Sequence, residues 1–205
     1  YQNLEQLTKL LEPFTLRIEK KDCLDLPDKT FVKQAIELHP QQKRVYESMR
    51  DDCLAMLKSG ELVTSTLALT KIVKLHQILT VCDALAKEYG AHQVVAFSGN
   101  ESSSQRNKAV EHFQNGLANF FVGTSAAAKG LTLHRASTMV YYSNNYSLET
   151  RLQSQDRIHR IGQNNKCTYI DLVVPQTVDD AILKRLDEKK ELSSMVLDDL
   201  IEIIK

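Results

Sequence analysis

The apolar residues of this chain change their spacing near residue 90, from a helical pattern to short runs typical of buried strands. From Pro40, apolar positions recur every three or four residues, which predicts a helix. A second helical pattern covers 67–89 and ends at Gly90, where a glycine favours helix termination. Residues 1–39 read as a polar connecting segment with one alternating strand at 30–38.

From residue 94 onward, short apolar runs alternate with helical segments. Such runs are expected for strands whose two faces are both covered, and their alternation with helices predicts a parallel sheet. We therefore predict an α/β fold in which a parallel sheet carries helices on both faces. Its ligands should lie at the carboxyl ends of the strands. The predicted strands are 94–97, 120–122, 138–142 and 168–174, and the predicted helices are 105–115, 148–161 and 178–190.

These patterns divide the chain into a connecting segment at 1–39, a mainly helical extension at 40–77, an α/β lobe at 78–192 and a C-terminal helix at 193–205. The C-terminal helix repeats apolar residues at helical spacing. Such a stripe favours packing against the core over a partner site.

Composition narrows the class of protein. With 205 residues, the chain can bury one good core but hardly two complete lobes. Its 26 basic and 26 acidic residues cancel, so bulk charge gives no argument for nucleic acid. The four cysteines have no CxxC spacing, which indicates neither a disulfide framework nor a metal site. No apolar run reaches the roughly 18 residues of a membrane span, so we expect no membrane partner.

The most informative segment is 153–163, with the sequence QSQDRIHRIGQ. On a helix, Gln153, Arg157 and Arg160 share one face because they are spaced i, i+4 and i+7. Neighbouring arginines repel each other unless each meets a carboxylate or both meet a polyanion such as a triphosphate. Spacing alone leaves both readings open, a solvated basic face with acidic neighbours and a phosphate site.

The same segment resembles motif VI of the Swi/Snf branch of helicase superfamily two, whose pattern Q-x-x-D-R-x-H-R-x-G-Q is matched at every fixed position. Residues 123–133 are similar to motif V of annealing-helicase or phage-type relatives. Ser98-Gly99 and Arg106 are similar to a loop and helix of the same C-terminal lobe. Residues 11–29 resemble the bridge between the two lobes, so the segment 1–39 is assigned to that bridge.

The resemblance implies the C-terminal RecA-like lobe of an ATP-dependent DNA translocase or helicase. Arg157 and Arg160 would then be arginine fingers that reach the γ-phosphate of ATP across the cleft between the lobes. Gln153 would orient their helix, and Gly130 would let the backbone of motif V approach the nucleotide. Asp156 would brace a basic residue of its own helix or of the opposite surface.

The resemblance also implies that double-stranded DNA is a partner. Hydroxyl and backbone N–H groups in strand-end loops would contact DNA phosphates, and basic side chains would add salt-dependent contacts. The residues concerned are Ser98, Arg106, Thr124, Ser125 and Lys129. A helix cap at 102–104 and a solvated Lys129 are equally good readings of these positions. His159 reads as a hydrogen-bonded support rather than a base.

The sequence departs from the family pattern in two places. It contains no G-x-x-x-x-G-K-[ST] loop. We therefore expect the chain to be inactive alone and to need an N-terminal helicase lobe, in cis or in trans, that grips ATP and supplies Mg²⁺. The apolar strand of motif IV is also missing, because residues 71–78 run straight into Leu79.

The leading hypothesis is half of a DNA-dependent ATPase of the helicase type. The alternative is a non-catalytic DNA-binding or regulatory module derived from the same lobe, and the missing strand also leaves an inactive remnant open. We expect a cytoplasmic protein of a bacterial or phage-infected cell, in preference to a nuclear protein of a eukaryote.

Overall fold

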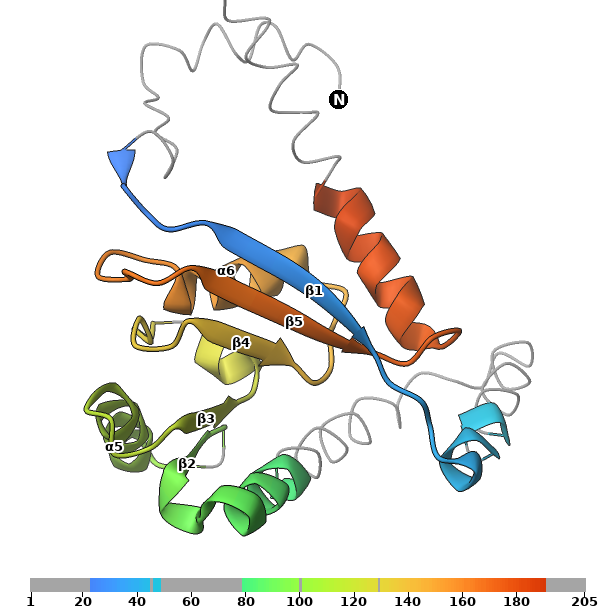
Figure 1. The fold of residues 1–205 in the computed structure, drawn as a ribbon, viewed down its shortest axis with the longest axis horizontal. Helices are drawn as coiled ribbons and strands as arrows, with labels where there is room; N and C mark the ends of the chain where they lie inside the picture. Colours follow the sequence, from blue (N-terminus) through green and yellow to red (C-terminus); the bar gives the residue numbers. More distant parts are fainter. Residues whose placement is uncertain (1–22, 45, 49–78, 100, 129, 191–205) are drawn as a thin grey trace, which may run out of the picture.

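The computed structural model describes residues 23–44, 46–48, 79–99, 101–128 and 130–190 (Figure 1). Helical residues outside the labelled elements lie at 40–44, 46–48, 79–89 and 178–190. The labelled helices are η2 (Ala91–Gln93), α5 (Ser103–Gln114), η3 (Ser125–Ala128) and α6 (Leu148–Ile158). The strands are β1 (Lys29–Ala35), β2 (Val94–Phe97), β3 (Phe120–Gly123), β4 (Thr138–Tyr141) and β5 (Cys167–Val173).

The strands form two parallel ladders, one in the order β1-β5-β4 and one that pairs β2 with β3. The central strand, β5, pairs along its whole length with β1 and along its first residues with β4. Its side chains alternate between buried and half-buried positions, as expected for a strand whose neighbouring residues point to opposite faces. The prediction of a parallel α/β fold is confirmed.

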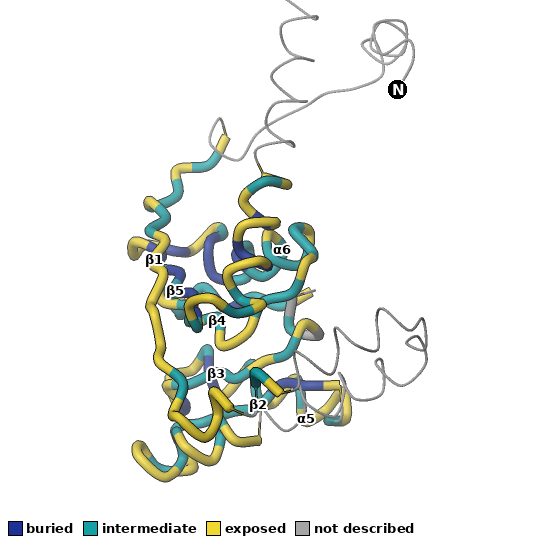
Figure 2. Tube along the Cα trace, turned by 90° about the vertical axis from the view of Figure 1, so that its right-hand side faces the viewer, coloured by how far each residue is buried: buried dark blue, intermediate teal, exposed yellow. Residues whose placement is uncertain are grey.

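One face of the three-stranded ladder is covered by two helices. The buried residues of β5 point to this face, where α6 and the helix at 178–190 pack. In Figure 2, α6 lies to one side of β1 and β5. Val32 and Val140 belong to the opposite face and are 39% and 53% exposed. Coverage of that second face stays a prediction.

The ladder of β2 and β3 has helices on both of its faces. The ring of Phe121 meets Phe113 of α5 at a centroid distance of 5.5 Å. The next residue, Phe120, points the other way and meets Tyr89 of the helix at 79–89, at 4.8 Å. Helix α5 begins with a capping box, because Ser102 accepts a hydrogen bond from Gln105 N and the Gln105 side chain accepts one from Ser102 N. The helix cap at 102–104, which the sequence left as one of two readings, is therefore present at Ser102.

One of the two buried clusters among the described residues joins the two ladders and α6. Figure 2 shows buried stretches of backbone at β5 and near α6. Tyr169 lies at the centre of this cluster, fully buried and stacked on Phe31 at 5.2 Å. Its hydroxyl donates to the backbone carbonyl of Gln155 in α6. Burial raises the pKa of the Tyr169 phenol far above its ordinary value. The cluster contains Phe113, Leu133, Ile158, Cys167 and Tyr169.

Most predicted element bounds agree with the structure to within two or three residues. The strand predicted at 30–38 ends at Ala35, because its partner β5 ends at Val173. The helix predicted at 148–161 ends at Ile158, where His159 leaves helical geometry. Four predicted features fall outside the described residues: the bridge up to residue 22, most of the helical extension, the missing strand and the C-terminal helix.

Within the part of the chain that is described, no helix is long and apolar enough to cross a membrane. The same residues contain no group of three His, Cys, Asp or Glu side chains that could hold a metal ion. Of the described cysteines, Cys23, Cys82 and Cys167 form no disulfide bond.

Candidate functional site

Helix α6 carries Arg157, and the bend that follows it carries Arg160. Both arginine side chains nevertheless meet one backbone carbonyl. The first turn of α6 is capped by Ser147, whose hydroxyl accepts from Thr150 N. Arg157 Nη1 donates to Leu131 O at 3.1 Å, and Arg160 Nη1 donates to the same oxygen at 3.2 Å. Arg160 Nη1 also donates to Thr132 Oγ1 at 2.9 Å. The structure therefore places the pair against the loop that resembles motif V.

No carboxylate neutralises this pair among the described residues. Arg157 makes one further bond, from Nε to Gln153 O, and the remaining guanidinium N–H groups form no hydrogen bond within the described part of the chain. Two like charges on one neutral carbonyl are electrostatically costly unless an anion joins them. The arrangement therefore favours a phosphate site over a basic face paired with acids.

The arginine pair lies away from the carboxyl ends of the strands. Helix α6 starts after the carboxyl end of β4 and runs back, so that His159 reaches Pro27 O, just ahead of β1. Thr132 lies in the segment that returns from η3 to the start of β4. The expectation that the site residues gather at the carboxyl ends of the strands is wrong for these two side chains, because a helix antiparallel to the strands carries them away from those ends.

Gln153 and Asp156 lie on α6 close to the arginines. Gln153 Nε2 donates to Glu149 Oε1 at 2.7 Å, while Gln153 Oε1 is buried without a hydrogen-bond partner in the described region. A buried acceptor with no donor normally finds one from water or a ligand. Asp156 is half-buried and interacts with other groups of the chain. Their predicted roles toward the nucleotide stay predictions.

Gly130 has φ +73°, and an added Cβ would meet no atom within 4 Å. The glycine is therefore required by its left-handed backbone. The open space beside it is compatible with a ligand, so the predicted close approach of nucleotide stays a prediction.

We expect Gly130→Ala to lower the free energy of unfolding by about 1–2 kcal/mol, the usual cost of a left-handed conformation for a residue with a Cβ. Urea unfolding followed by circular dichroism measures the change. Gly99→Ala is the matched control, because its Cβ would also enter open space and its backbone is not left-handed. Equal losses in the two variants would contradict the conformational explanation.

The predicted DNA-binding residues of motif V lie next to α6, against which η3 packs. Ser125 is the first residue of η3 and is exposed. The backbone N–H of Thr124 donates to Phe97 O, which ties the end of β3 to the end of β2. Lys129 falls outside the described residues. The structure thus brings Thr124 and Ser125 together in one loop.

Ser98 is 3% exposed, and its donors already have an anionic partner. Both its backbone N–H and its hydroxyl donate to Glu101 Oε2, at 2.5 and 2.7 Å. Burial raises the pKa of Glu101, but the two bonds from Ser98, a bond from its own backbone and the charge of Arg106 together bring the pKa below its usual value. A DNA phosphate could bond to Ser98 only by displacing this carboxylate.

The guanidinium of Arg106, another predicted DNA-binding residue, lies over the ring of Phe97, at 5.8 Å from the ring centroid.

Three contacts near the arginines were not predicted from sequence. Thr132 belongs to the motif V segment, but its bond to Arg160 depends on a tertiary contact. Gln163, the last residue of the motif VI pattern, is buried and donates from Nε2 to the carbonyls of His134, Ala136 and Ile158. His159 Nε2 lies 2.8 Å from Pro27 O. The role of His159 as a hydrogen-bonded support was predicted, but its partner, Pro27 O, was not.

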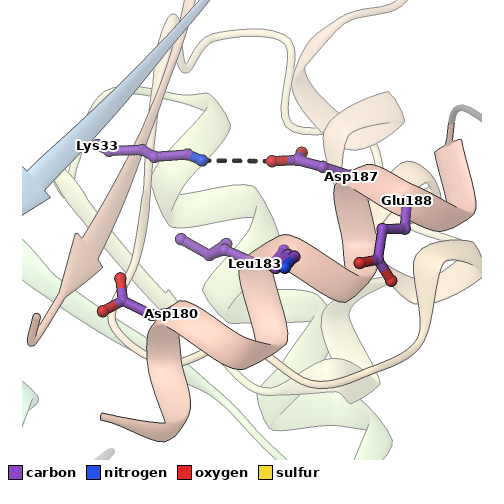
Figure 3. A pocket seen from close by; sticks show the side chains of 6 residues that line it. Lys33, Asp180, Leu183, Asp187 and Glu188 are labelled. Carbon is purple, nitrogen blue, oxygen red and sulfur yellow. Dashed lines mark hydrogen bonds and ion pairs between the residues drawn. The ribbon is translucent and has the colours of Figure 1, made fainter. Parts of the chain in front are cut away.

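A cavity of about 360 Å³ lies elsewhere, between β1 and the helix at 178–190 (Figure 3). Lys33 and Asp187 form an ion pair at its edge, with 3.3 Å between Nζ and Oδ2. Both side chains are mostly exposed, so solvent screens the pair. None of the predicted site residues lines this cavity, which is bordered by Lys33, Asp180, Leu183, Lys184, Asp187 and Glu188.

Residues 42–162 match the family described as Helicase conserved C-terminal domain. The chain is 29% identical over 150 residues to the Chromatin-remodeling ATPase INO80 of Homo sapiens, covering 68% of this chain and 10% of that protein. It is 23% identical over 241 residues to an Uncharacterized ATP-dependent helicase of Mycoplasma pneumoniae, covering 96% of this chain and 23% of that protein. The chain thus spans less than a quarter of the length of either relative.

Among solved structures, the C-terminal part of the Fun30 ATPase domain has a similar fold. The TM-score is 0.56 at 15% sequence identity, and the match covers 79% of this chain and 90% of that one. This similarity concerns the fold alone. It confirms the predicted architecture of a parallel sheet with flanking helices.

Proposed function

The chain belongs to the Helicase conserved C-terminal domain family, in its Swi/Snf-type branch, and we propose that it supplies the arginine fingers of an ATP site shared with an N-terminal helicase lobe. The observation that carries the proposal is the convergence of Arg157 and Arg160 on Leu131 O without a neutralising carboxylate in the described region. Their unused N–H groups suit the developing charge on a transferred phosphoryl group.

Bound ATP would supply the phosphoryl group that passes to water, and the N-terminal lobe would hold Mg²⁺. The residues of this chain would place positive charge beside that group. Arg157 and Arg160 would donate to phosphate oxygens, and Thr132 accepts from Arg160 and keeps it beside the loop. Gln153 has a buried carbonyl oxygen available to a donor. Open space lies beside Gly130, whose backbone is left-handed, and a nucleotide would approach the loop there.

DNA binding is the second part of the proposal. The loop that carries Thr124 and Ser125 packs through η3 on α6, so a duplex held by this loop would lie close to Arg157 on that helix. Lys129 and Arg106 would add salt-dependent contacts to phosphates. Ser98 would contact a DNA phosphate only after the phosphate replaced Glu101 as the acceptor of its two hydrogen bonds. We propose 78–192 as the lobe that carries both sites and 1–39 as its bridge.

The test is ATP hydrolysis by the whole chain joined to an N-terminal helicase lobe, with and without duplex DNA. We expect hydrolysis that requires the second lobe and rises when DNA is added. DNA affinity that persists without any ATP hydrolysis would favour the alternative, a non-catalytic DNA-binding or regulatory module. A broad, low-temperature unfolding transition would instead indicate an inactive remnant.

A further inference from the structure

A buried ion pair lies at the start of α6, away from the arginine pair. Arg151 and Asp171 of β5 form a two-pronged bond, at 2.5 Å from Nη1 to Oδ1 and at 2.7 Å from Nη2 to Oδ2. Their side chains are only 10% and 6% exposed. Paired bonds of this kind fix the angle between two groups as well as their distance. The pair therefore sets how the first turns of α6 lie on β5.

Neighbouring groups complete the arrangement. Asn144 accepts from Arg151 Nη1 and donates from Nδ2 to Asp171 Oδ1, so it bonds to both charged partners. The Arg151 guanidinium also lies over the ring of Tyr141, at 3.6 Å from its centroid. The Tyr141 hydroxyl is within 2.7 Å of Ser154 Oγ, on the next turn of α6. The whole group connects β4, the loop after it, α6 and β5.

Stability alone gives no reason for this arrangement. Removing two charges from water is costly, and apolar side chains of similar volume usually stabilise a core as well or better. What an apolar pair lacks is direction, because hydrophobic contact does not specify an orientation. An ion pair with paired bonds at this position is thus better explained by the orientation of α6 than by the strength of the fold.

The other end of α6 is held separately. Gln163 donates to three carbonyls, and Leu133 N donates to Arg157 O. Arg157 follows Arg151 by six residues, about 9 Å along a helix. A change of tilt at the first turn would therefore move the guanidinium groups relative to anything that faces them from another lobe.

We propose that Arg151 and Asp171 are positioning residues for the arginine fingers. They touch neither substrate nor reacting atoms, and they act through the orientation of α6. This inference rests on the proposed function, since it concerns the turnover to which Arg157 and Arg160 would contribute. A misplacement of about 1 Å is enough to lower a catalytic rate by roughly 10²-fold.

The test replaces both partners by apolar residues, Arg151→Met with Asp171→Leu, in the whole chain joined to an N-terminal helicase lobe. We expect kcat for DNA-stimulated ATP hydrolysis to fall by about 10–100-fold. The KM for ATP and the Tm should change little. A merely structural pair would lower the Tm and leave kcat per folded molecule unchanged, and that result would overturn the proposal.

Arg151→Lys is the second variant, because it keeps the charge but cannot form two parallel bonds. It should also lower kcat with little effect on KM, and an unchanged kcat would overturn the proposal even if the apolar pair failed to fold. The control is Arg185→Met with Glu188→Leu, which removes an exposed ion pair of the same lobe. If the unmodified protein shows no DNA-stimulated hydrolysis, the proposed function is contradicted. If the unmodified protein hydrolyses ATP and the variants hydrolyse it at the same rate, only the positioning role is contradicted.

Discussion

Replacing Arg160 by alanine should lower DNA-stimulated ATP hydrolysis by about 10³-fold or more, the usual contribution of an arginine finger. Arg160 forms no ion pair with a described carboxylate, and its Nη1 is held by Leu131 O and Thr132 Oγ1. Its loss leaves no unpaired buried charge in the described structure. The Tm should therefore change little while kcat collapses.

Arg157→Ala should have a similar effect, and the double variant should lose less than the product of the two single losses. The two guanidinium groups share Leu131 O, and groups that act as a unit are not additive. Steady-state hydrolysis with saturating duplex DNA measures all three variants. Arg160→Lys should not rescue turnover, because an ammonium group cannot reproduce the planar fork.

Arg185→Ala is the matched control, since Arg185 is exposed and, among the described residues, its one ion pair is with Glu188. It should hydrolyse ATP at the unmodified rate. If Arg160→Ala kept that rate as well, Arg160 would not be an arginine finger. If Arg160→Ala instead abolished DNA binding while a DNA-independent rate survived, the arginine would belong to the DNA interface.

The sequence predicted the arginine pair through its helical spacing and the motif, but it could not predict the pair's partners. Leu131 and Thr132 precede the arginines by more than twenty residues, and only the return of the chain from η3 to β4 brings them together. Nor could the sequence show that Arg151, on the same helix as Arg157, is neutralised by Asp171 inside the core.

The strands were predictable because each is marked by an apolar run in its own sequence. The residue at which a strand ends depends also on the strand that pairs with it. The strand predicted at 30–38 keeps its alternating pattern past Ala35, but pairing stops where β5 stops. Likewise, the pattern alone does not say which face of β5 receives α6. Two contacts decide that face: Tyr169 donates to Gln155 O, and Asp171 accepts from Arg151. Both connect residues that lie far apart in the chain.

Ser98 shows a different limit of sequence reasoning. Its position after β2 and its hydroxyl group are typical of a phosphate contact. Local sequence also places Glu101 three residues later, but only the turn of the loop makes that carboxylate the partner of both Ser98 donors. A contact with DNA would therefore require exchange of one anion for another.

Removing Asp171 alone should destabilise the lobe by about 3–5 kcal/mol, the range measured when one partner of a buried ion pair is lost. Asp171→Leu leaves the Arg151 guanidinium only 10% exposed in the present geometry, with Asn144 Oδ1 and the ring of Tyr141 as remaining partners. Since domains are stable by roughly 5–15 kcal/mol, much of the total would be lost. The midpoint of urea unfolding measures it.

Comparing the stability of Asp171→Leu with that of the double replacement separates the effect of an unpaired buried charge from the effect of changed packing. Arg151→Met with Asp171→Leu leaves no buried charge, so it should recover most of the stability that Asp171→Leu loses. Asp187→Leu, which breaks the exposed pair with Lys33, should cost at most about 1 kcal/mol. The stability loss of Asp187→Leu should depend more on salt concentration than the loss of Asp171→Leu, because salt strongly screens only exposed ion pairs. A loss below about 1 kcal/mol for Asp171→Leu would mean that water reaches Arg151, and the pair could then no longer be treated as buried.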